Sequence, residues 1–458
     1  MRVQQAEIDS LRAAVAELQE RVACARKDST TSSKPPSSDL VKPSPPAPPE
    51  GQAKRSIGGQ PGHPFHERPL VDAALLNGGS HTYAAEICPQ CGHGLQASPL
   101  PPHIVQQIDI ETVPIRIEEH RAAAGWCAHC RKVHYAALPS GIDKGGLVGP
   151  RLTTLIAYLK GACHASYSTI RKYLRDVLEV TISRGQLAKV IGKVSQALDA
   201  PYAALLENLP TQPVLNVDET GHRENGEQWW TWCFRGSLYT VFKIDPTRSG
   251  DVLLEVLGEE FNGVLGCDYF SAYRRYMREC NIVVQFCLAH LIRDVKYLLT
   301  LPDARDRAYG ERVREALRHL FGIIHRRGDL PDWAFDVRLG DARREVLRQA
   351  LTDVPASRAS QNIAERFRKH GQAYFEFVTT PGVEPTNNLA EQAIRFVVID
   401  RRITQGTRGE KGRRWCERIW TVIATCTQQG QSVFEYLSAA VAAYFSGDAA
   451  PPLLPTES

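Results

Sequence analysis

Two short apolar runs of the sequence each end in an aspartate. Asp218 follows VLNV and Asp268 follows VLGC, and both runs have the composition of buried strands. A third acid, Glu391, lies in the helical stretch NNLAEQAIR. If the two strands pair in one sheet, the aspartates lie side by side, and a helix packed across the sheet can bring Glu391 close to them. Three clustered carboxylates raise one another's pKa values unless divalent cations bind there.

A magnesium site is the chemistry that these acids predict. Mg²⁺ (or Mn²⁺) takes carboxylate oxygens and keeps exchangeable water molecules. Two such ions can activate a water or a 3′-hydroxyl and stabilise the leaving oxygen of a phosphodiester. The pattern alone leaves an alternative open, in which Asp218 caps a turn and Glu219 pairs with a nearby arginine. Because neighbouring side chains on a strand point to opposite faces, Glu219 is expected to point away from the ions and to tolerate substitution.

Four cysteines form a second candidate metal site. ICPQCGHGL and GWCAHCRKVHY hold two CxxC pairs, and the 35 residues between the pairs (92–126) include a stretch that alternates like two strands. Two pairs of thiolates can complete a closed, structural zinc site in a zinc ribbon. Redox pairs or coincidence are the alternative, and His93 and His134 are candidate substitute ligands. The predicted zinc ligands are Cys88, Cys91, Cys127 and Cys130.

The overall composition is that of a globular protein with several domains. The chain has 458 residues, of which 43% are hydrophobic and 23% charged. No apolar run reaches the roughly 18 residues of a membrane span, and the N-terminus lacks a secretory signal pattern. We therefore expect a cytoplasmic protein without disulfides. The formal net charge of +4 is too small to imply a polyanionic partner by itself.

The N-terminal region precedes the globular part. Its apolar residues recur in alternating steps of three and four, which predicts a short coiled coil over residues 1–28, although an ordinary amphipathic helix fits as well. These residues are Ile8, Leu11, Val15, Leu18 and Val22. Residues 29–74 are rich in Pro, Ser and Gly, which predicts a linker. The zinc ribbon is expected over residues 75–142.

Residues 145–200 are predicted to form helices that resemble a helix-turn-helix. The break VTISRGQ places Ser183 where a helix N-cap belongs, between helices that begin near Ser168 and Arg184. Eight Lys or Arg accompany three acids between residues 151 and 200, so the pair could bind phosphates through Arg171, Lys172 and Arg184. A solvated helical connector is the alternative.

The rest of the chain predicts a mixed α+β core in two parts. Strand and helix patterns alternate over residues 205–300, with a hairpin between EQWWTWCFRG and SLYTVFKID. Residues 301–380 are charged and helix-periodic. Residues 381–445 supply the last helices, and residues 446–458 are expected to be a flexible tail.

The order of these motifs resembles transposases of the bacterial IS66 insertion-sequence family. The resemblance runs from about residue 8 to about residue 440 and includes SSKPPSSD, GGQPGHP, the CxxC pairs, VDETG, CLAHLIRD and EPTNNLAEQAIR. It implies a ribonuclease H-like α/β catalytic core with a helical insertion before the last acid. It maps the acids of a DDE triad onto Asp218, Asp268 and Glu391. It also matches Cys287 and His290 to a C-x2-H signature of several DDE groups, for which we expect a structural role near the site.

The resemblance also bears on DNA contacts. Many DDE enzymes carry Lys or Arg seven positions after the glutamate, but here that residue is Val398, and Arg395 is the nearest candidate. TQGTRGEKGRRW mixes glycine with bases, as a flexible phosphate-binding loop would, although a solvated loop has the same composition. The loop's candidate DNA-binding residues are Arg408, Lys411, Arg413 and Arg414.

The activity that the resemblance implies is DNA transposition. The enzyme would bind the terminal inverted repeats, nick DNA and join the 3′-hydroxyl to target DNA, with two Mg²⁺ (or Mn²⁺) ions and a structural Zn²⁺. It would act as a homo-oligomer, expected to be a dimer, on the bacterial nucleoid, together with accessory proteins of the same element. Two alternatives are an inactive zinc-ribbon regulator and a ribonuclease H-like nuclease without strand transfer. Retention of three acids argues against the first, and the DNA-binding modules argue mildly against the second.

Overall fold

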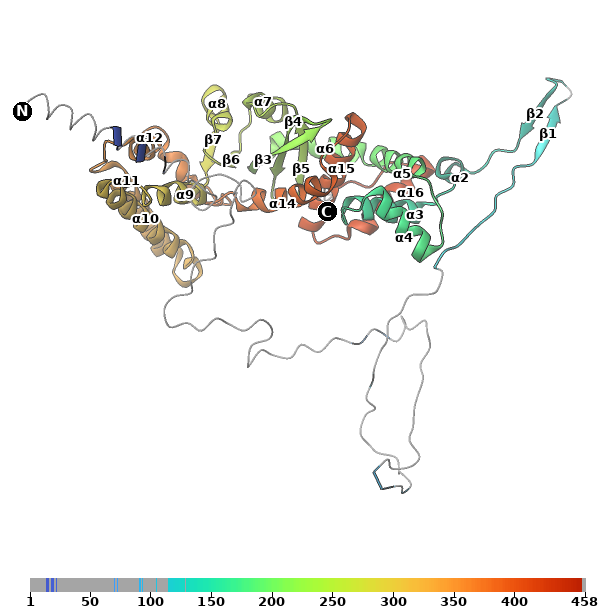
Figure 1. Cartoon of the computed structure of the whole chain (residues 1–458), viewed down its shortest axis with the longest axis horizontal. Helices are drawn as coiled ribbons and strands as arrows, with labels where there is room; N and C mark the ends of the chain where they lie inside the picture. Colours follow the sequence, from blue (N-terminus) through green and yellow to red (C-terminus); the bar gives the residue numbers. More distant parts are fainter. Residues whose placement is uncertain are drawn as a thin grey trace, which may run out of the picture. The chain divides into compact units, whose positions relative to one another are not determined.

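The computed structural model describes residues 114–127 and 129–454, with isolated positions before residue 114 (Figure 1). Residues 44–118 form a unit of their own. The predicted coiled coil and linker lie almost entirely outside the described residues, although the few positions described between residues 14 and 22 are helical and exposed. No helix in the described part of the chain is long and apolar enough to cross a membrane.

A five-stranded mixed sheet carries two of the predicted acids. Its strands are β3 (Val214–Glu224), β4 (Glu227–Arg235), β5 (Thr240–Asp245), β6 (Val264–Cys267) and β7 (Val283–Phe286). They follow the order β5-β4-β3-β6-β7. The pairs β3–β4 and β4–β5 are antiparallel, which confirms the predicted hairpin, whereas β3, β6 and β7 are parallel.

Strand β3 is longer than its apolar run predicts. The strand continues through Asp218 to Glu224. A two-residue turn fixes this continuation, because Asn225 (φ 51°) and Gly226 (φ 87°) both have positive φ and the flanking residues pair with each other. Asn-Gly is the preferred sequence of such a type I′ turn. Asp218 therefore lies in the middle of a strand rather than at its end.

Helices connect the parallel strands, as parallel pairing requires. Helix α7 (Gly250–Leu257) lies between β5 and β6, and α8 (Ser271–Cys280) lies between β6 and β7. Helix α9 (Leu288–Leu298) follows β7 directly. Helix α14 (Asn388–Thr404) packs on β3 and β4 and brings the third predicted acid to the sheet.

Helix α15 (Glu410–Gln428) covers the outer edge of the sheet. An edge strand leaves alternate backbone N–H groups unpaired, and on β5 these groups donate to side chains of α15. The acceptors recur every four residues and so share one face of the helix. The bonds run from Ile244 to Glu417 (2.8 Å), from Phe242 to Thr421 (3.0 Å) and from Thr240 to Thr425 (3.2 Å).

A helical layer combines segments from before and after the sheet. The predicted helix pair is present, and Ser183 caps its second helix by accepting the N–H of Gln186 (3.1 Å). Helices α3 and α5 pack against α15 and α16 (Figure 1). Leu453 in the predicted tail accepts a hydrogen bond from Gln429, the residue directly after α15. The layer's elements are α2 (Ser140–Gly145), α3 (Pro150–Gly161), α4 (Tyr167–Leu178), α5 (Arg184–Ala197), α6 (Asp199–Asn208), η3 (Leu209–Thr211) and α16 (Val433–Ser446).

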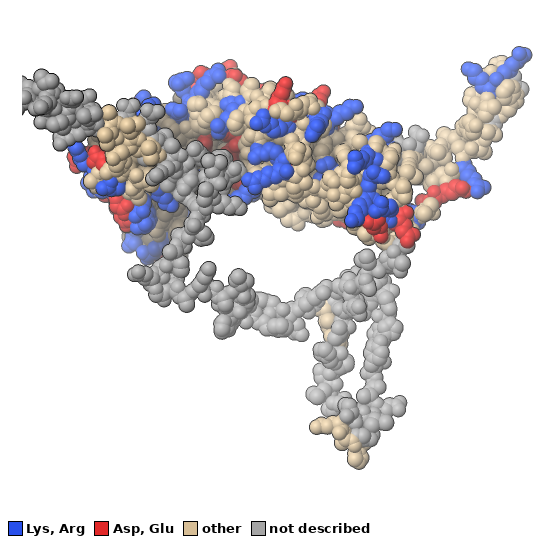
Figure 2. Space-filling view, in the orientation of Figure 1, with Lys and Arg blue, Asp and Glu red and all other residues tan. Residues whose placement is uncertain are grey.

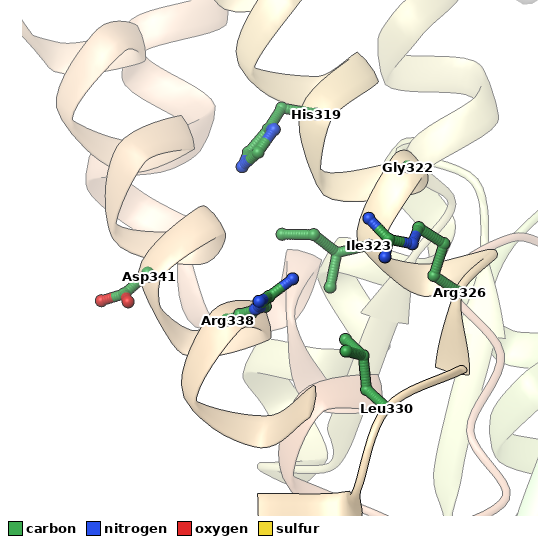
Figure 3. A pocket seen from close by; sticks show the side chains of 7 residues that line it. All are labelled: His319, Gly322, Ile323, Arg326, Leu330, Arg338 and Asp341. Carbon is green, nitrogen blue, oxygen red and sulfur yellow. The ribbon is translucent and has the colours of Figure 1, made fainter. Parts of the chain in front are cut away.

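The helical insertion lies between α9 and α14, as predicted. Helices α10 and α11 run side by side and enclose a surface hollow of about 490 Å³ (Figure 3). Its lining comes only from these two helices and the segment between them, so no predicted site residue lines it. The insertion's elements are α10 (Ala304–Ile324), η4 (Arg327–Asp329), α11 (Asp332–Leu351), α12 (Arg358–His370), η5 (Gln372–Tyr374) and α13 (Glu376–Thr379).

Candidate active site

The two aspartates occupy equivalent positions on neighbouring parallel strands. In the register of β3 and β6, Asn216 is the partner of Gly266, and Asp218 and Asp268 each lie two residues further along. Asp218 lies within β3, and Asp268 directly follows β6. Parallel pairing therefore brings the two residues together, as the sequence pattern predicts.

Asn387, the residue before α14, joins that helix to the sheet. Its side chain donates to the carbonyl oxygen of Val217 (2.8 Å) and accepts a hydrogen bond from Asn216 (3.2 Å). Its backbone N–H donates to Sγ of Cys287 (3.1 Å). These bonds fix the start of α14 against the middle of β3. Glu391 lies in the first turn of α14, where its charge acts on Asp218.

The three acids interact through their charges. Burial, followed by the charges of Glu219, Asp268 and Glu391, raises the pKa of Asp218 well above its usual value. Burial and then Glu219 raise the pKa of Asp268 to about 7, although a hydrogen bond from the backbone of Phe270 opposes the shift. Buried carboxyl groups whose ionisation is opposed by burial and by neighbouring acids form an arrangement that a bound divalent cation would relieve.

The acids also leave oxygen atoms free for a cation. Among the described residues, the carboxylate of Asp218 accepts a hydrogen bond only from the backbone N–H of Glu219 (3.0 Å). Oε1 of Glu391 is buried and has no hydrogen-bond partner within the described part of the chain. A set of carboxylate oxygens with unused lone pairs fits a hard cation such as Mg²⁺.

Glu219 forms an ion pair and a hydrogen bond of its own. These contacts correct the expectation that Glu219 tolerates substitution. It is buried, and it accepts a hydrogen bond from Arg248 Nε (2.7 Å) and another from the hydroxyl of Tyr273. Its charge also raises the pKa of Asp268. The interpretation in which Glu219 pairs with an arginine is therefore correct for Glu219, whereas Asp218 has no cationic partner among the described residues.

Cys287 and His290, at the start of α9, lie next to the start of α14. Burial raises the pKa of the Cys287 thiol to about 11, so the sulfur stays protonated while it accepts the N–H of Asn387. Nδ1 of His290 lies 3.5 Å from Glu391, and burial followed by the charge of Arg293 lowers the pKa of the ring to about 4. The sulfur, a ring nitrogen and a Glu391 oxygen lie within 4.8 Å of one another, close enough to hold one metal ion.

Comparison with known proteins identifies the family of the chain. The family model described as Transposase IS66 family matches residues 145–414, which is more than half of the chain and includes all three acids. The chain belongs to the IS66 transposase family.

Two further matches extend the comparison of this IS66-family chain. A family of unknown function (DUF6444) matches residues 2–69, the region of the predicted coiled coil and linker. A curated relative from Sinorhizobium fredii, described as uncharacterized protein y4qI, is 24% identical over 343 residues, or 66% of this chain. The chain spans 61% of that relative's length.

Half of the predicted zinc site of this IS66-family chain lies on a hairpin. β1 (Ala124–Cys127) and β2 (Lys132–Tyr135) are antiparallel; Cys127 ends β1, and Cys130 lies in the turn between the two strands. The backbone N–H of Cys130 donates to Sγ of Cys127 (3.5 Å), and this bond lowers the pKa of the Cys127 thiol. Sγ of Cys130 lies 3.1 Å from Nε2 of His134. The knuckle can thus present two sulfur ligands and one nitrogen ligand.

The first CxxC pair of the predicted zinc site, Cys88 and Cys91, lies mostly outside the described residues. Cys88 lies outside the described residues. Cys91 and His93 are isolated described positions in the unit of residues 44–118. The four-cysteine ligand set therefore stays a prediction.

The predicted DNA-binding residues of the helix pair are exposed, and two of them also form hydrogen bonds within the protein. Arg171 donates to the carbonyl oxygen of Ile182 (3.1 Å), and Arg184 donates to Oγ of Ser168 (2.6 Å). These bonds fix the turn between α4 and α5 while the guanidinium groups stay at the surface. Lys172 is exposed as well.

One face of α14 runs from the acids toward basic residues. Glu391, Arg395, Val398 and Arg402 follow one another in steps of four, three and four, so they share a face of the helix. Arg395 and Arg402 are exposed and flank Val398. Sequence spacing alone points to Arg395, and Arg402 becomes a candidate once the helix is known to extend to Thr404.

The basic loop after α14 is anchored to β3 rather than free. The N–H of Thr407 donates to Arg223 (2.8 Å), and its carbonyl oxygen accepts the N–H of Asn225 (3.0 Å). Arg413 pairs with Glu224 (3.1 Å), and its side chain is 17% exposed. Arg413, near the start of α15, therefore links that helix end to β3, and Glu224 offsets its charge.

The other basic residues of the TQGTRGEKGRRW segment differ in whether they form ion pairs. Arg414 pairs with Glu417 (3.3 Å). Arg408 and Lys411 are exposed and form no ion pair within the described part of the chain. Lys and Arg side chains are spread over the face drawn in Figure 2 rather than gathered in one patch.

Proposed function

We propose that this chain is the DNA transposase of an insertion sequence, which nicks DNA at transposon ends and joins the freed 3′-hydroxyl to target DNA. The observation that carries the proposal is that Asp268, after β6, and Glu391, on α14, lie close enough to Asp218 on β3 for their charges to raise its pKa. The strand order β5-β4-β3-β6-β7, with an insertion before the last acid, supports a ribonuclease H-like core. Membership of the IS66 transposase family supports the reaction class.

Asp218, Asp268 and Glu391 would hold Mg²⁺ (or Mn²⁺), as two ions. When bound, such ions lower the pKa of water and stabilise charge on phosphodiester oxygens. The chain's own residues position the acids. Asn387 sets the start of α14 against β3, and Arg293, whose Nη2 lies 3.5 Å from Glu391, restricts the carboxylate.

The proposed reaction has two steps at phosphorus. Water first attacks a phosphodiester at the transposon end, and the bond to the 3′-oxygen breaks, which frees a 3′-hydroxyl. This hydroxyl then attacks a phosphodiester of the target, whose own 3′-oxygen leaves. Each step forms one P–O bond and breaks one, so the same carboxylate site can serve both.

The other parts of the chain would bring DNA and partner chains to this site. Cys88, Cys91, Cys127 and Cys130 would hold a structural Zn²⁺, and the zinc ribbon and the helix pair α4–α5 would bind the terminal inverted repeats. Residues 1–28 would assemble a dimer. Accessory proteins of the same element and a cytoplasmic, nucleoid-associated location complete the proposal.

Incubation of the purified full-length chain with Mg²⁺ and a labelled duplex of the element's end tests this function. Nicking together with a joined product is the expected result. Nicking without joining would instead identify a nuclease. Binding of the end without either product would identify a regulator.

A further inference from the structure

A cluster of aromatic rings and guanidinium groups adjoins the acids and has no role in the mechanism above. Tyr269 directly follows Asp268. The guanidinium carbon of Arg274, on α8, lies 4.6 Å from the centre of the Tyr269 ring. That of Arg366, on α12 of the insertion, lies 4.5 Å from the same centre. Tyr269 therefore contacts both the sheet's own helix and the insertion beside the acid site.

The charges of this cluster do not balance. Arg366 donates to Asp294 (2.8 Å), and Asp294 is close enough to Asp268 to help raise its pKa. Arg274 forms no ion pair among the described residues, and its Nε is buried without a hydrogen-bond partner there. Asp294 is thus paired with Arg366, and the guanidinium group of Arg274 is left without a paired carboxylate among the described residues.

An unpaired, half-buried arginine is costly because burial of a charge is unfavourable without a partner. A guanidinium group binds a phosphate through parallel hydrogen bonds, and an aromatic ring beneath it holds its plane. A phosphodiester of a bound DNA strand supplies the missing negative charge. Nearby His370 supplies none, because an imidazole ring is either neutral or positively charged, and burial followed by the charge of Arg274 lowers its pKa.

We propose that Arg274 binds a phosphate of the DNA strand that enters the acid site, adjacent to the bond to be cut. Tyr269 holds the guanidinium group, and the same ring contacts Arg366 of the insertion, so the insertion adjoins this phosphate subsite. The subsite deepens the proposed function and rests on it.

Arg275 provides a matched control on the same helix. It is exposed, and it forms ion pairs with Asp251 (3.2 Å) and Glu279 (2.9 Å). The full-length wild type, Arg274→Gln and Arg275→Gln are titrated with the end duplex in Ca²⁺, across a range of salt concentrations. Duplexes in which single phosphates near the cut are replaced by neutral methylphosphonates are titrated in parallel.

Arg274→Gln is expected to weaken binding about tenfold and to reduce the salt slope by about 0.9, the value of one phosphate contact. One methylphosphonate should weaken binding by the wild type and have no further effect on Arg274→Gln. Arg275→Gln should behave as the wild type. The subsite would be overturned if Arg274→Gln kept the wild-type salt slope and the wild-type response to each methylphosphonate. It would also be overturned if Arg274→Gln and Arg275→Gln lost the same binding affinity.

Two further measurements keep the test decisive. If Arg274→Gln does not fold, Arg274→Lys keeps the charge but lacks parallel hydrogen bonds, and it should weaken binding of the unmodified duplex but not of the methylphosphonate duplex. The subsite would be overturned if Arg274→Lys bound both duplexes with the same affinities as the wild type. If the phosphate contact is found but the wild type neither nicks nor joins, the subsite stands and the proposed function fails.

Discussion

At the scale of single residues, the surroundings of Asp218 and Asp268 disfavour the ionised form of both side chains. Each accepts a hydrogen bond from a nearby backbone N–H group, yet burial and neighbouring carboxylates still raise both pKa values. Glu219, between them in the charge network, is instead paired with Arg248 and Tyr273. The neighbouring acids of VDETG therefore have different roles.

Asp268→Asn is expected to stabilise the metal-free protein. The pKa of Asp268 rises from 3.8 to about 7 on folding, so the stability that this group contributes is fully present below about pH 4 and is lost as the pH rises toward 7. The amide does not titrate. In EDTA at pH 8 the free energy of unfolding of the variant should exceed that of the wild type by roughly 1–3 kcal/mol. At pH 4 the two free energies should be equal.

Denaturant unfolding at both pH values measures this difference. A variant that is less stable than the wild type at pH 8 would mean that the protein itself offsets the charge of Asp268, and that no cation is needed there.

Glu219→Gln is expected to destabilise the fold. The change leaves Arg248 without its carboxylate beside a buried position, and such a loss costs about 2–3 kcal/mol when one partner is partly exposed. Thermal unfolding should show the loss, whereas Asp218→Asn, one residue away, should show none. Equal stability of Glu219→Gln and the wild type would mean that the pair with Arg248 contributes nothing.

The three acids could be proposed from the sequence because two of them follow apolar runs and the third lies in a recognisable helix. Their partners could not. Arg248 and Tyr273 reach Glu219 from 29 and 54 residues further along the chain, and no local pattern encodes such a contact. Asn387, which joins α14 to β3 across 170 residues, could not be predicted for the same reason.

At the scale of elements, the site depends on how α14 is attached to the sheet. The strands, the insertion and the helix could be predicted from periodicity. The length of β3 could also have been predicted from Asn225-Gly226, a strong local turn signal that the sequence interpretation missed. The cover of β5 by α15 depends on tertiary packing and leaves no such signal.

Asn387→Ala tests this attachment. The loss of two buried side-chain hydrogen bonds is expected to cost about 1–3 kcal/mol of stability. It should also raise the Mg²⁺ concentration needed for half-maximal nicking, because Glu391 is no longer held against β3. Asn388→Ala is the matched control, since Asn388 is the next residue, is exposed and forms no side-chain bond among the described residues. An unchanged Mg²⁺ requirement in Asn387→Ala would contradict the positioning role.

At the scale of the whole molecule, helices from before and after the sheet form one layer. Helices α3 and α5 pack on α15 and α16, so the helix pair proposed to bind DNA ends is attached directly to the helices behind the sheet. A sequence pattern predicts each helix but not which distant helices meet. The hairpin with Cys127 and Cys130 precedes this layer and carries the described half of the zinc site.

Cys127→Ser is expected to remove zinc. Purified wild type should contain about one Zn²⁺ per chain, and the variant should lose it together with the ordered ribbon, because zinc binding and folding of such a site are coupled. Cys163→Ser is the control, since Cys163 is an exposed cysteine outside the CxxC pairs. Elemental analysis that finds no zinc in the wild type, or full zinc in Cys127→Ser, would contradict the four-cysteine site.

The most direct test of the account is DNA cleavage by the acid variants. Asp218→Asn, Asp268→Asn and Glu391→Gln keep side-chain size but remove the charge, so nicking and joining in Mg²⁺ should each fall by about 100-fold or more while binding of the end duplex persists. Because the three residues serve one site, double variants should be no worse than single ones. Glu384→Gln, an exposed acid shortly before α14, should retain full activity. Wild-type cleavage by any one of the three variants would contradict the assignment of that acid to the catalytic site.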